Sequence, residues 1–566
     1  MKKSSTGALT KEQHEIQDQR YAEGHEYDYV IIGSGHSALV VGSLLAKAGN
    51  KICILEAHDV PGGYAHTFKA GDYSFCAQIH YTWSCGPGAK MYQFLEKLGL
   101  ERKLTWNLYD SDGYDQMVMP DGQRVKIPYG WDRLAENIDA AYPGQKEKVV
   151  KFTGIMARLR EEMRYFPEKK IHWWELPLKA RKLRCLLKYR TRTLQEVFNE
   201  CGLSPEAQAV LIANSGDLAE PPERLSVFCY AGLFGGYNTG AYYPTKHFQG
   251  YIGGLADFIK SQGGQMYFET EVTKVNTEAD RVIGVETKNG RTFTAKKGFI
   301  CNMDPQAAAK RLIGWNKFPP REQKKLDYEY SLTGLMIYLG LDDKIDLRDH
   351  GFGNFNIWHL EQWDMNKMWR EQKEMNFARP WFFMSTPTLH TEEPGMAPPG
   401  CQILEIASFM GYEPFRAVQR KSYGEYMKLK IKLADRLLDL VEERYLPDLR
   451  QHIVVKQIGS PTTNEDFCLA PKGNAYGSAM TPAQVGLSRL KARTPWPNFW
   501  WCNASSGYAG IAGTLHTGLQ LYMDLSGDYF IDSQKLATDD ELIAALPKQL
   551  EPRARHSGGR PRSRES

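Results

Sequence analysis

The stretch DYVIIGSGHSALVVGSLLAKAGNKICILEAHDVPGGYAHTF, residues 28–68, decides the fold. The apolar run 29–32 predicts a strand buried on both faces, residues 39–48 predict a helix, and residues 51–55 predict a second buried strand. Between the first strand and the helix lies the turn GSGHSA at 33–38, a G-x-G-x-x-A pattern. This order of strand, glycine turn, helix and strand predicts a βαβ unit of the kind that binds dinucleotides.

The small residues of this turn have roles that larger side chains would obstruct. Gly33 permits the tight turn, Gly35 lets the backbone approach a pyrophosphate, and Ala38 lets the helix and strand pack closely. The N-terminus of the helix offers unpaired N–H groups and the positive end of a dipole to phosphates. Glu56, at the end of the second strand, is placed to accept hydrogen bonds from ribose hydroxyls, and its charge would repel a 2′-phosphate. The sequence therefore predicts a dinucleotide other than NADP.

The glycine pair Gly62-Gly63 distinguishes between the remaining dinucleotides. It follows Glu56 closely and lets the chain cross near a long, extended cofactor, which an NAD dehydrogenase does not need. A second glycine-rich segment, ASSGYAGIAG at 504–513, follows the predicted strand 497–503 and leads into a helix that ends near residue 525. Its glycines would let the helix N-terminus approach an isoalloxazine ring, and the helix dipole would stabilise negative charge on the reduced ring. Together these features predict FAD as the cofactor.

Composition and charge narrow the function classes. With 566 residues the chain is long enough for two domains, and its net charge of +4 gives no indication of nucleic acid binding. The ten cysteines are scattered without a C-x-x-C pair, which excludes a zinc ribbon or a disulfide framework and indicates a reducing compartment, cytoplasmic or organellar. We expect neither secretion nor a transmembrane helix, because the N-terminal segment lacks an apolar core and no apolar run approaches about 20 residues. No metal-ligand spacing occurs, so no metal site is expected.

A basic segment at 169–192 carries nine lysine and arginine residues against one acid. Trp173 and Trp174 lie side by side in it, and its leucines share one helical face. Such a basic amphipathic segment can lie in a membrane interface, which predicts peripheral membrane contact. A solvated surface helix whose leucines face the core explains the same pattern, so both interpretations stay open.

Three motifs together resemble the phytoene desaturase, carotenoid isomerase and retinol saturase family of FAD-dependent oxidoreductases. They are the glycine-rich unit at 33–63, the block from YYP at 242–244 to Val275, and WWCNASSGYAGIAGTLHTG at 500–518. The retinol saturase branch is nearest, because GGYAHTF followed by QIHYTW is similar to its motifs. The resemblance implies an α/β fold: a Rossmann-like FAD-binding domain of the glutathione reductase and amine oxidase type, with an interleaved α+β substrate domain.

The resemblance also implies how the chain divides and which residues bind the cofactor. We expect a flexible N-terminal arm at 1–27, an FAD-binding domain from 28–105, 235–305 and 491–530, a substrate and membrane-facing domain from 106–234 and 306–490, and a mobile basic tail at 531–566. In flavoproteins of this architecture, the residue at the position of Val272 offers backbone groups to the adenine. The expected cofactor-binding residues are Gly33, Ser34, Gly35, His36, Ser37, Ala38, Glu56, Ala57, Gly62, Gly63, His66, Thr67, Val272, Asn503, Gly510 and Ile511.

The chain departs from the family pattern at positions expected near the flavin and the substrate. FCAQ at 75–78 replaces Phe-Asp-x-Gly, and YPTKH at 243–247 replaces Tyr-Pro-x-Gly-Gly. Asn503 stands where a glycine usually precedes the final turn. These departures leave dinucleotide binding in place and bear on the identity of the substrate.

The resemblance implies desaturation, saturation or isomerisation of a carbon–carbon double bond in an apolar polyene or isoprenoid, with a hydride passing to or from the flavin. Since only one nucleotide fingerprint is present, an external electron acceptor or reductant is expected. His80, Tyr81, His247 and Tyr508 are the candidate catalytic residues, and His80 is the first choice as polar positioner or proton donor. Two alternatives stay open: a flavin oxidase acting on another substrate such as an amine, and a non-catalytic lipid carrier like the Rab GDP-dissociation inhibitors, which resemble this architecture.

Overall fold

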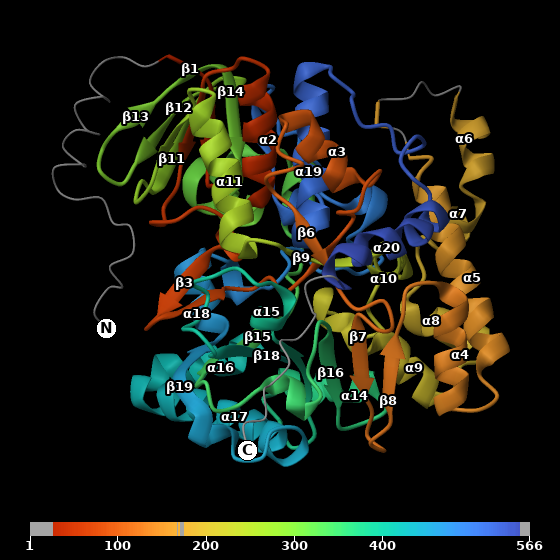
Figure 1. Cartoon of the computed structure of the whole chain (residues 1–566). Coiled ribbons are helices and arrows are strands. Elements are labelled where there is room, and N and C mark those ends of the chain that lie inside the picture. Colours follow the sequence, from red (N-terminus) through yellow and green to blue (C-terminus); the bar gives the residue numbers. More distant parts are fainter. Residues whose placement is uncertain (1–25, 167, 170–174, 555–566) are drawn as a thin grey trace.

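A five-stranded parallel sheet forms the centre of the upper lobe of the molecule (Figure 1). The computed structural model describes residues 26–166, 168–169 and 175–554. In this sheet the spatial order is β10-β2-β1-β14-β20, and every neighbouring pair runs parallel. Its strands are β1 (Tyr27–Ile32), β2 (Ile52–Leu55), β10 (Gln265–Tyr267), β14 (Ala295–Cys301) and β20 (Phe499–Trp501). The predicted βαβ unit and the predicted last strand therefore belong to one sheet.

Helix α2 (His36–Lys47) is buried from its first residue to Ala46. It packs against the sheet and against α11 (His247–Ser261) and α19 (Gly510–Ser526). A Cβ atom on residue 518 would lie 2.7 Å from the Ser37 carbonyl oxygen, so α19 approaches α2 this closely because residue 518 is glycine. The packing brings the first residues of α2 and of α19 to the same edge of the sheet, and the expected Rossmann-like core is confirmed.

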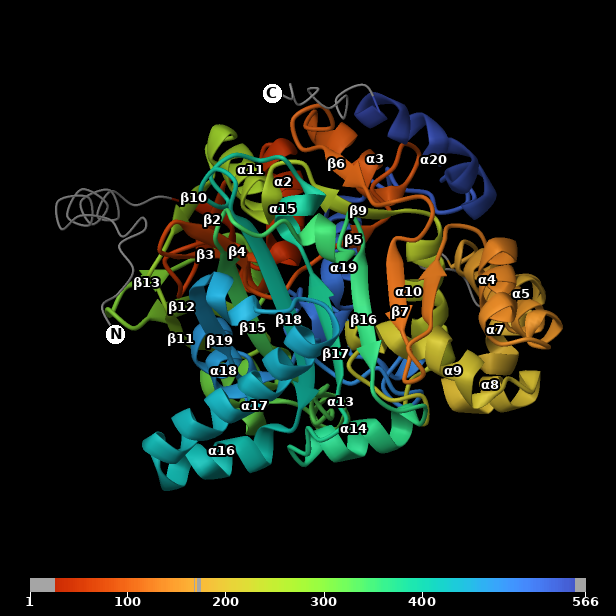
Figure 2. The ribbon, with the colours of Figure 1, turned by 60° about the horizontal axis from the view of Figure 1, so that its bottom comes forward.

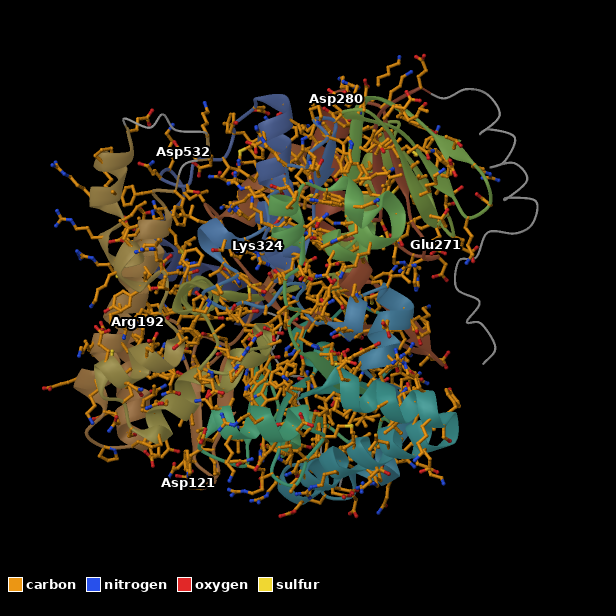
Figure 3. All side chains as sticks on the ribbon, turned by 180° about the vertical axis from the view of Figure 1, so that it is seen from behind. Asp121, Arg192, Glu271, Asp280, Lys324 and Asp532 are labelled. Atoms are coloured by element: carbon orange, nitrogen blue, oxygen red, sulfur yellow. The ribbon has the colours of Figure 1, made fainter. Side chains whose placement is uncertain are left out.

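A three-stranded antiparallel sheet lies beside the parallel sheet and contains β11 (Val272–Glu278), β12 (Arg281–Thr287) and β13 (Thr292–Phe293). Seen from behind, Asp280 marks the outer tip of this hairpin and Glu271 marks its base (Figure 3). The next strand along the chain, β14, leaves this layer and inserts between β1 and β20. Its last four residues are buried, as a strand covered on both faces requires.

The lower lobe is built on a seven-stranded sheet of order β19-β15-β18-β17-β16-β7-β8, seen across its strands in Figure 2. Strands β7 and β8 form an antiparallel hairpin, whose turn residues PDGQ at 120–123 lie between them. An apolar cluster between the sheet and α17 (Tyr423–Arg444) forms the core of this lobe. The strands are β7 (Asp115–Val118), β8 (Arg124–Ile127), β15 (Thr333–Leu341), β16 (Asn356–Leu360), β17 (Trp381–Ser385), β18 (Gln402–Met410) and β19 (Ile453–Gly459).

Short strands and helices connect the two lobes and cover them. Two small sheets pair β3 (Thr67–Ala70) with β4 (Tyr73–Cys76), and β9 (Ala241–Pro244) with β5 (Thr82–Trp83) and β6 (Trp106–Leu108). Further helices of the two lobes are α3 (Lys90–Leu98), α12 (Pro305–Ala308), α13 (Pro320–Leu326), α14 (Met365–Lys373), α15 (Pro387–His390), α16 (Tyr412–Lys421) and α18 (Pro461–Cys468).

A group of helices at one side of the molecule contains the predicted basic segment. The helices are α4 (Trp131–Ala141), α5 (Lys146–Met163), α6 (Leu176–Lys182), α7 (Arg184–Tyr189), α8 (Leu194–Cys201), α9 (Pro205–Ile212) and α10 (Val227–Asn238). The basic segment forms two short helices, α6 and α7, with a break at Leu183, and Leu187 is 41% exposed. Trp173 and Trp174 lie outside the described residues. Among those described, no helix combines the length and apolarity needed to cross a bilayer.

The expectation of a mobile tail from residue 531 is wrong for its first part. Ile531 is 2% exposed, and helix α20 (Asp539–Ala554) buries Leu546, which is 3% exposed. The Arg160 guanidinium donates a hydrogen bond to each oxygen of the Asp539 carboxylate, at 2.7 and 3.0 Å. Residues 531–547 thus pack onto the rest of the molecule (Figure 1), because Ile531, Leu542 and Leu546 are buried in a segment that is polar overall. Residues 555–566 lie outside the described part.

Candidate functional site

One pocket opens along the carboxyl edge of the five-stranded sheet, with a volume of about 390 Å³. The segments that follow β1, β2, β14 and β20 all contribute to its walls, which is where open α/β sheets bind their ligands. Its lining includes Glu56 and Val272 beside the antiparallel hairpin. It also includes Ile79 and Tyr476, so the pocket extends from the sheet toward the lower lobe.

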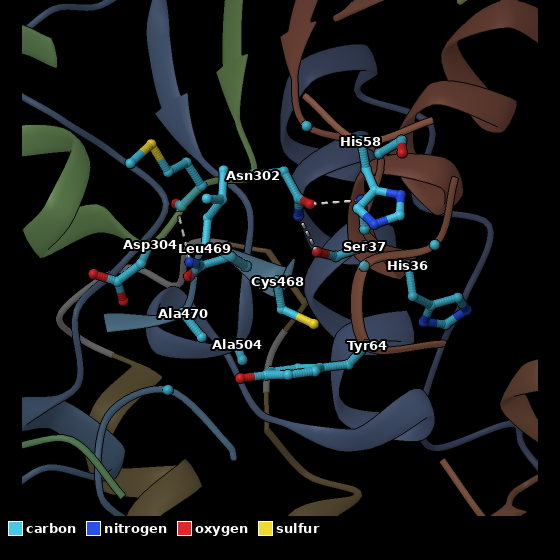
Figure 4. A pocket seen from close by; sticks show the side chains of 18 of the residues that line it. His36, Ser37, His58, Tyr64, Asn302, Asp304, Cys468, Leu469, Ala470 and Ala504 are labelled. Carbon is cyan, nitrogen blue, oxygen red and sulfur yellow. Dashed lines mark hydrogen bonds between the residues drawn. The ribbon is translucent and has the colours of Figure 1, made fainter. Parts of the chain in front are cut away.

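Asn302, the first residue after β14, connects three chain segments at the pocket wall. Its Oδ1 atom accepts a hydrogen bond from the Gly35 amide at 2.8 Å, and its Nδ2 atom donates to Ser37 Oγ at 2.9 Å and to the Cys502 carbonyl. A Cβ atom on residue 35 would lie 2.4 Å from Asn302 Oδ1, so the contact requires glycine. Figure 4 shows Asn302 with Ser37 and His58 on one side and Leu469 and Ala470 on the other.

The N-terminus of α2 faces the pocket through His36 and Ser37. Among the described residues no side chain caps this helix, and its first turn carries no acid. Its free N–H groups and the positive end of its dipole therefore act on whatever the pocket holds. This end of the pocket suits an anionic group such as a phosphate.

Glu56 is fixed at the pocket wall by three hydrogen bonds. Its Oε2 atom accepts from the Ser34 amide at 2.7 Å and the Ser34 hydroxyl at 2.5 Å, and its Oε1 atom accepts from the His58 amide at 2.9 Å. A carboxylate oxygen has two lone pairs, so Oε1 keeps acceptor capacity for hydroxyl donors inside the pocket. The arrangement provides a rigid acceptor at the end of β2.

The side chain of His36 points away from the pocket into the interior. Its Nε2 atom lies 2.7 Å from the Tyr251 hydroxyl and its Nδ1 atom 2.8 Å from the Thr514 hydroxyl. Burial lowers the pKa of His36 to about 3, so the ring is neutral at physiological pH. His36 therefore ties α2 to α11 and α19 and contributes only its backbone to the pocket.

The structure brings most of the predicted cofactor-binding residues together around this one pocket. Ala38 and Thr67 lie outside its lining, because Ala38 is fully buried against the sheet and Thr67 lies in β3. The side chain of His66 lines the pocket, with Nδ1 2.6 Å from the Gly63 carbonyl oxygen. The predicted residues in the lining are Gly33, Ser34, Gly35, His36, Ser37, Glu56, Ala57, Gly62, Gly63, His66, Val272, Asn503, Gly510 and Ile511.

The four predicted catalytic residues all lie outside this lining, two of them directly behind it. His80 and Tyr81 follow Ile79, which lines the pocket, and both are paired with buried carboxyl groups of the lower lobe. His80 Nδ1 lies 2.9 Å from Glu405 Oε2 in β18. Burial raises the pKa of Glu405, and the contact with His80 partly offsets this rise. The stretch 78–81 thus has one end in the pocket and the other in the lower lobe.

His247 and Tyr508 also lie outside the pocket lining, and each is held by contacts of its own. His247 is 2% exposed, has a φ of +58°, and burial lowers its pKa to about 4. It packs at the start of α11 against the ring of Tyr243 and is a structural residue of that corner. Tyr508 precedes the pocket residues of α19, and its ring lies 5.3 Å from the guanidinium of Arg489. Burial raises the pKa of Tyr508, so its hydroxyl stays protonated.

A segment from 466 to 477 covers the pocket and was missed by the sequence analysis. Cys468, Leu469 and Ala470 line the pocket opposite Tyr64, whose hydroxyl donates to the Asn474 carbonyl (Figure 4). Leu469 adopts a left-handed backbone conformation with φ of +51°, which side chains other than glycine rarely adopt. Its PKGN at 471–474 is an ordinary turn pattern that indicates no ligand, so the sequence did not point to this cover.

Asn302 and Asp304 were also missed, although a signal for them existed. Both line the pocket, and they follow the buried strand β14, whose carboxyl end is where such sheets bind ligands. Asp304 caps α12 and accepts hydrogen bonds from Tyr328 at 2.6 Å and Tyr330 at 2.7 Å. The two polar residues Asn302 and Asp304, directly after an apolar strand, could have identified this wall.

The fold and the pocket together define a class, the two-domain FAD-dependent oxidoreductases. The chain belongs to the family of flavin containing amine oxidoreductases, which matches residues 39–415. Membership confirms the cofactor and the oxidoreductase chemistry predicted from the sequence, and it sets aside the non-catalytic lipid carrier. Among solved structures, putrescine oxidase superposes with a TM-score of 0.61 at 15% identity, covering 89% of this chain and 99% of its own. That likeness confirms the expected fold class.

Proteins similar over nearly the whole chain confirm the resemblance stated from the motifs. The all-trans-retinol 13,14-reductase of Danio rerio is 24% identical over 520 residues, which cover 87% of this chain and 84% of that protein. The chloroplastic prolycopene isomerase 1 of an Oncidium hybrid cultivar is 23% identical over 547 residues, which cover 93% of this chain and 88% of that protein. Both branches named by the motifs are thus represented among its relatives.

Proposed function

We propose that this flavoenzyme saturates, desaturates or isomerises a carbon–carbon double bond of a carotenoid-like or retinoid-like polyene. The observation that carries the proposal is this pocket, whose lining includes the glycine turn as well as Ile79 and Tyr476. The similar retinol reductase and prolycopene isomerase, by their names, act on conjugated polyenes. An apolar end beside a polar, phosphate-compatible end is what a lipid-directed flavoenzyme needs.

The residues of the pocket fit FAD, and we propose these roles for them. The uncapped N-terminus of α2 suits the pyrophosphate, and the free acceptor capacity of Glu56 suits ribose hydroxyls. Val272 stands at the adenine end of the lining, and Gly510 brings the N-terminus of α19 to the opposite end. When bound, FAD supplies a two-electron hydride exchange that side chains cannot perform.

The protein's own contribution would be to orient the substrate and exclude water. The cover formed by Cys468, Leu469 and Ala470 closes one side of the pocket, held down by the bond from Tyr64 to the Asn474 carbonyl. Excluding water keeps a reduced cofactor from side reactions and strengthens every electrostatic interaction inside. His80, fixed by buried Glu405, stands directly behind the pocket residue Ile79 as a polar positioner.

We also propose the two-domain division expected from the sequence. All five strands of the parallel sheet fall within 28–105, 235–305 and 491–530, apart from the first residue of β1, which supports these ranges as the FAD-binding domain. All seven strands of the lower sheet fall within 106–234 and 306–490, which supports these ranges as the substrate domain.

The proposed reaction predicts which compounds exchange electrons with the flavin. FAD-loaded protein, incubated without oxygen with a panel of carotenoids, retinoids and amines, is expected to show changes in the flavin spectrum or a new polyene product only with the polyenes. Reduced and oxidised enzyme are both tested, so that saturation, desaturation and isomerisation are separated by chromatography of the products. Flavin bleaching by amines alone, without any change in a polyene, would contradict the proposal.

We further propose that the basic helices α6 and α7 contact an anionic membrane surface, from which an apolar substrate could be drawn. Arg181 and Arg184 are exposed, and Leu187 presents an apolar side chain beside them. In the view from behind, Arg192 lies on the outer edge of this helical side (Figure 3). A cationic surface with an exposed leucine is suited to a lipid interface.

Vesicle flotation tests this contact. The double substitution Arg181→Gln and Arg184→Gln is expected to lower partitioning onto anionic vesicles roughly 30-fold, since each basic residue near such a surface contributes about 1 kcal/mol. The double substitution Arg420→Gln and Lys421→Gln removes the same charge from the end of α16 and is the control. Changing Trp173 and Trp174 to alanine tests insertion of the tryptophans. Equal flotation of wild type and the Arg181→Gln, Arg184→Gln variant would contradict the proposed membrane contact.

A further inference from the structure

Two carboxyl groups meet at one tyrosine hydroxyl deep in the interior. Tyr81 Oη lies 2.7 Å from Asp217 Oδ2 and 3.2 Å from Asp115 Oδ2. Asp115 is fully buried in β7, whereas Asp217, at the end of the 3-10 turn Ala213–Asp217, keeps some exposed surface between buried neighbours. The groups that act on the two carboxyls are hydroxyls, amides, an indole and each other, and no cation of the described residues is among them.

The hydrogen bonds at Tyr81 require that one of these carboxyls is a neutral acid. A phenol has one proton to donate, so it can donate to one carboxylate only, and the second contact needs a carboxylic proton directed at the phenol oxygen. Burial raises the pKa of Asp115 to about 7 and the pKa of Asp217 to about 8. Two carboxyls that share a site titrate as a pair, and the pair holds a proton at physiological pH.

Polar side chains surround the pair, and some of their buried atoms lack a hydrogen-bond partner among the described residues. Neither amide atom of Asn214 has a hydrogen-bond partner among the described residues, although this side chain is fully buried and lies near enough to Asp115 to lower the pKa of that carboxyl. Buried polar groups are nearly always paired, and exceptions concentrate at functional sites. By contrast, Asp304 in the pocket wall has four donors and serves as a helix cap. The titratable groups that face the pair are Tyr81, Tyr114, Tyr129, Tyr237 and Tyr476.

The pair stands immediately behind the apolar end of the pocket. Tyr81 is two residues beyond Ile79, which lines the pocket, and its ring stacks on Tyr237 with centroids 4.1 Å apart. Tyr476 also lines the pocket, and the charge of Asp217 contributes to raising the pKa of its hydroxyl. Of the two acids, Asp217 is thus the one that keeps exposed surface and acts on a residue of the pocket lining, although it does not itself line the pocket.

We propose that Asp217 is the general acid and base of the reaction, with Tyr81 and Asp115 as positioning residues that hold its carboxyl group in place. This rests on the proposed function. In saturation, one alkene carbon receives the hydride of the reduced flavin, and the other forms a C–H bond with the Asp217 proton as the O–H bond breaks. The O–H electron pair stays on Asp217 as a carboxylate. The pair then holds no proton, and it regains one from solvent. Desaturation reverses each transfer.

Infrared spectroscopy of the FAD-loaded, full-length protein tests the shared proton without any substrate. The wild-type spectrum at neutral pH is expected to contain a protonated carboxylic acid band that Asp217→Asn and Asp115→Asn each remove. Glu162→Gln is the control, because Glu162 is 7% exposed and its carboxylate accepts hydrogen bonds from the Cys185 and Leu186 amides at 3.0 and 2.8 Å. A wild-type spectrum from which neither asparagine variant removes such a band overturns the proposal.

Single-turnover kinetics test the catalytic role. Oxidation of the reduced enzyme by all-trans-retinol is expected to slow about 100-fold or more in Asp217→Asn, as is typical when a general acid is removed. In wild type the rate is expected to fall as the pH rises through about 8, the pKa of Asp217, because only the protonated acid can donate. In Tyr81→Phe this pH midpoint shifts. Flavin content, read from absorbance, shows that the variants are folded.

The outcomes separate the two proposals. If wild type reacts with polyenes and Asp217→Asn keeps its rate and pH profile, the acid assignment is wrong and the proposed function stands. If wild type exchanges electrons with no polyene at all, the proposed function fails, and the catalytic role of Asp217 fails with it even where the infrared band is present.

Discussion

Replacing Gly35 by valine is expected to abolish flavin retention, lowering FAD affinity at least about 100-fold, or about 2.7 kcal/mol. A Cβ atom there would lie 2.4 Å from Asn302 Oδ1. Asn302 cannot turn aside without breaking its bonds to the Gly35 amide, Ser37 and the Cys502 carbonyl. Valine also places two methyl groups at the N-terminus of α2, where the pyrophosphate is proposed to lie. Flavin absorbance of the purified variant and titration with FAD measure the loss.

Gly154→Val is the matched control for this substitution. Gly154 lies inside α5 with nothing within 4 Å of its Cβ position, and its helix is not part of the pocket. Since valine is a slightly better helix former than glycine, its effect on stability should stay within about 0.5 kcal/mol. A Gly35→Val protein that purifies yellow with a full complement of FAD would refute the placement of the cofactor at this turn.

Ending the chain at Phe530 is expected to destabilise the protein by about 5 kcal/mol or to prevent soluble expression. The deletion removes the buried side chains of Ile531, Leu542 and Leu546, each of which contributes about 1.5–3 kcal/mol by burial. It also removes Asp539 and leaves Arg160, which is 15% exposed, without its carboxylate. Denaturant unfolding followed by circular dichroism measures the loss.

Ending the chain at Ala554 provides the comparison, because it removes only residues 555–566. This shorter deletion is expected to leave the free energy of unfolding within about 0.5 kcal/mol of wild type, as surface changes usually do. Asp539→Asn, which breaks the bidentate pair with Arg160 alone, should fall between the two deletions. Equal stability of all three proteins would mean that α20 contributes nothing to the fold.

The elements that the sequence could predict are those whose physics is local. The βαβ unit at 28–68 carries its strand, turn and helix in contiguous residues, and the hairpin of β7 and β8 has its turn residues between its strands. The docking of α20 could not be predicted, because its burial depends on Arg160, which is 379 residues away. The position of β14 in the parallel sheet could not be predicted either, because it depends on pairing with β1 and β20, which are distant in the sequence.

The residues of the candidate site also divide into those that the sequence could predict and those that it could not. The glycine turns and Glu56 could be recognised, because a tight turn near a pyrophosphate requires glycine and a ribose hydroxyl requires a hydrogen-bond acceptor. The partners of His80 and Tyr81 were not, since Glu405 and Asp217 join them only in the folded chain. One signal was present: Glu405 lies between apolar neighbours in QILEIASFM, and an acid in the middle of a buried strand is rarely there for stability.

The order of strands in the parallel sheet has a consequence for biosynthesis. Its edge strand β20 ends at Trp501, so the ribosome must release the chain up to this residue before the sheet can be completed. Until then β1, β2 and β14 expose apolar faces and an unpaired edge, which favours aggregation of the nascent chain. The sheet edge that lines the pocket is therefore completed only after the segment carrying β20 has been synthesised.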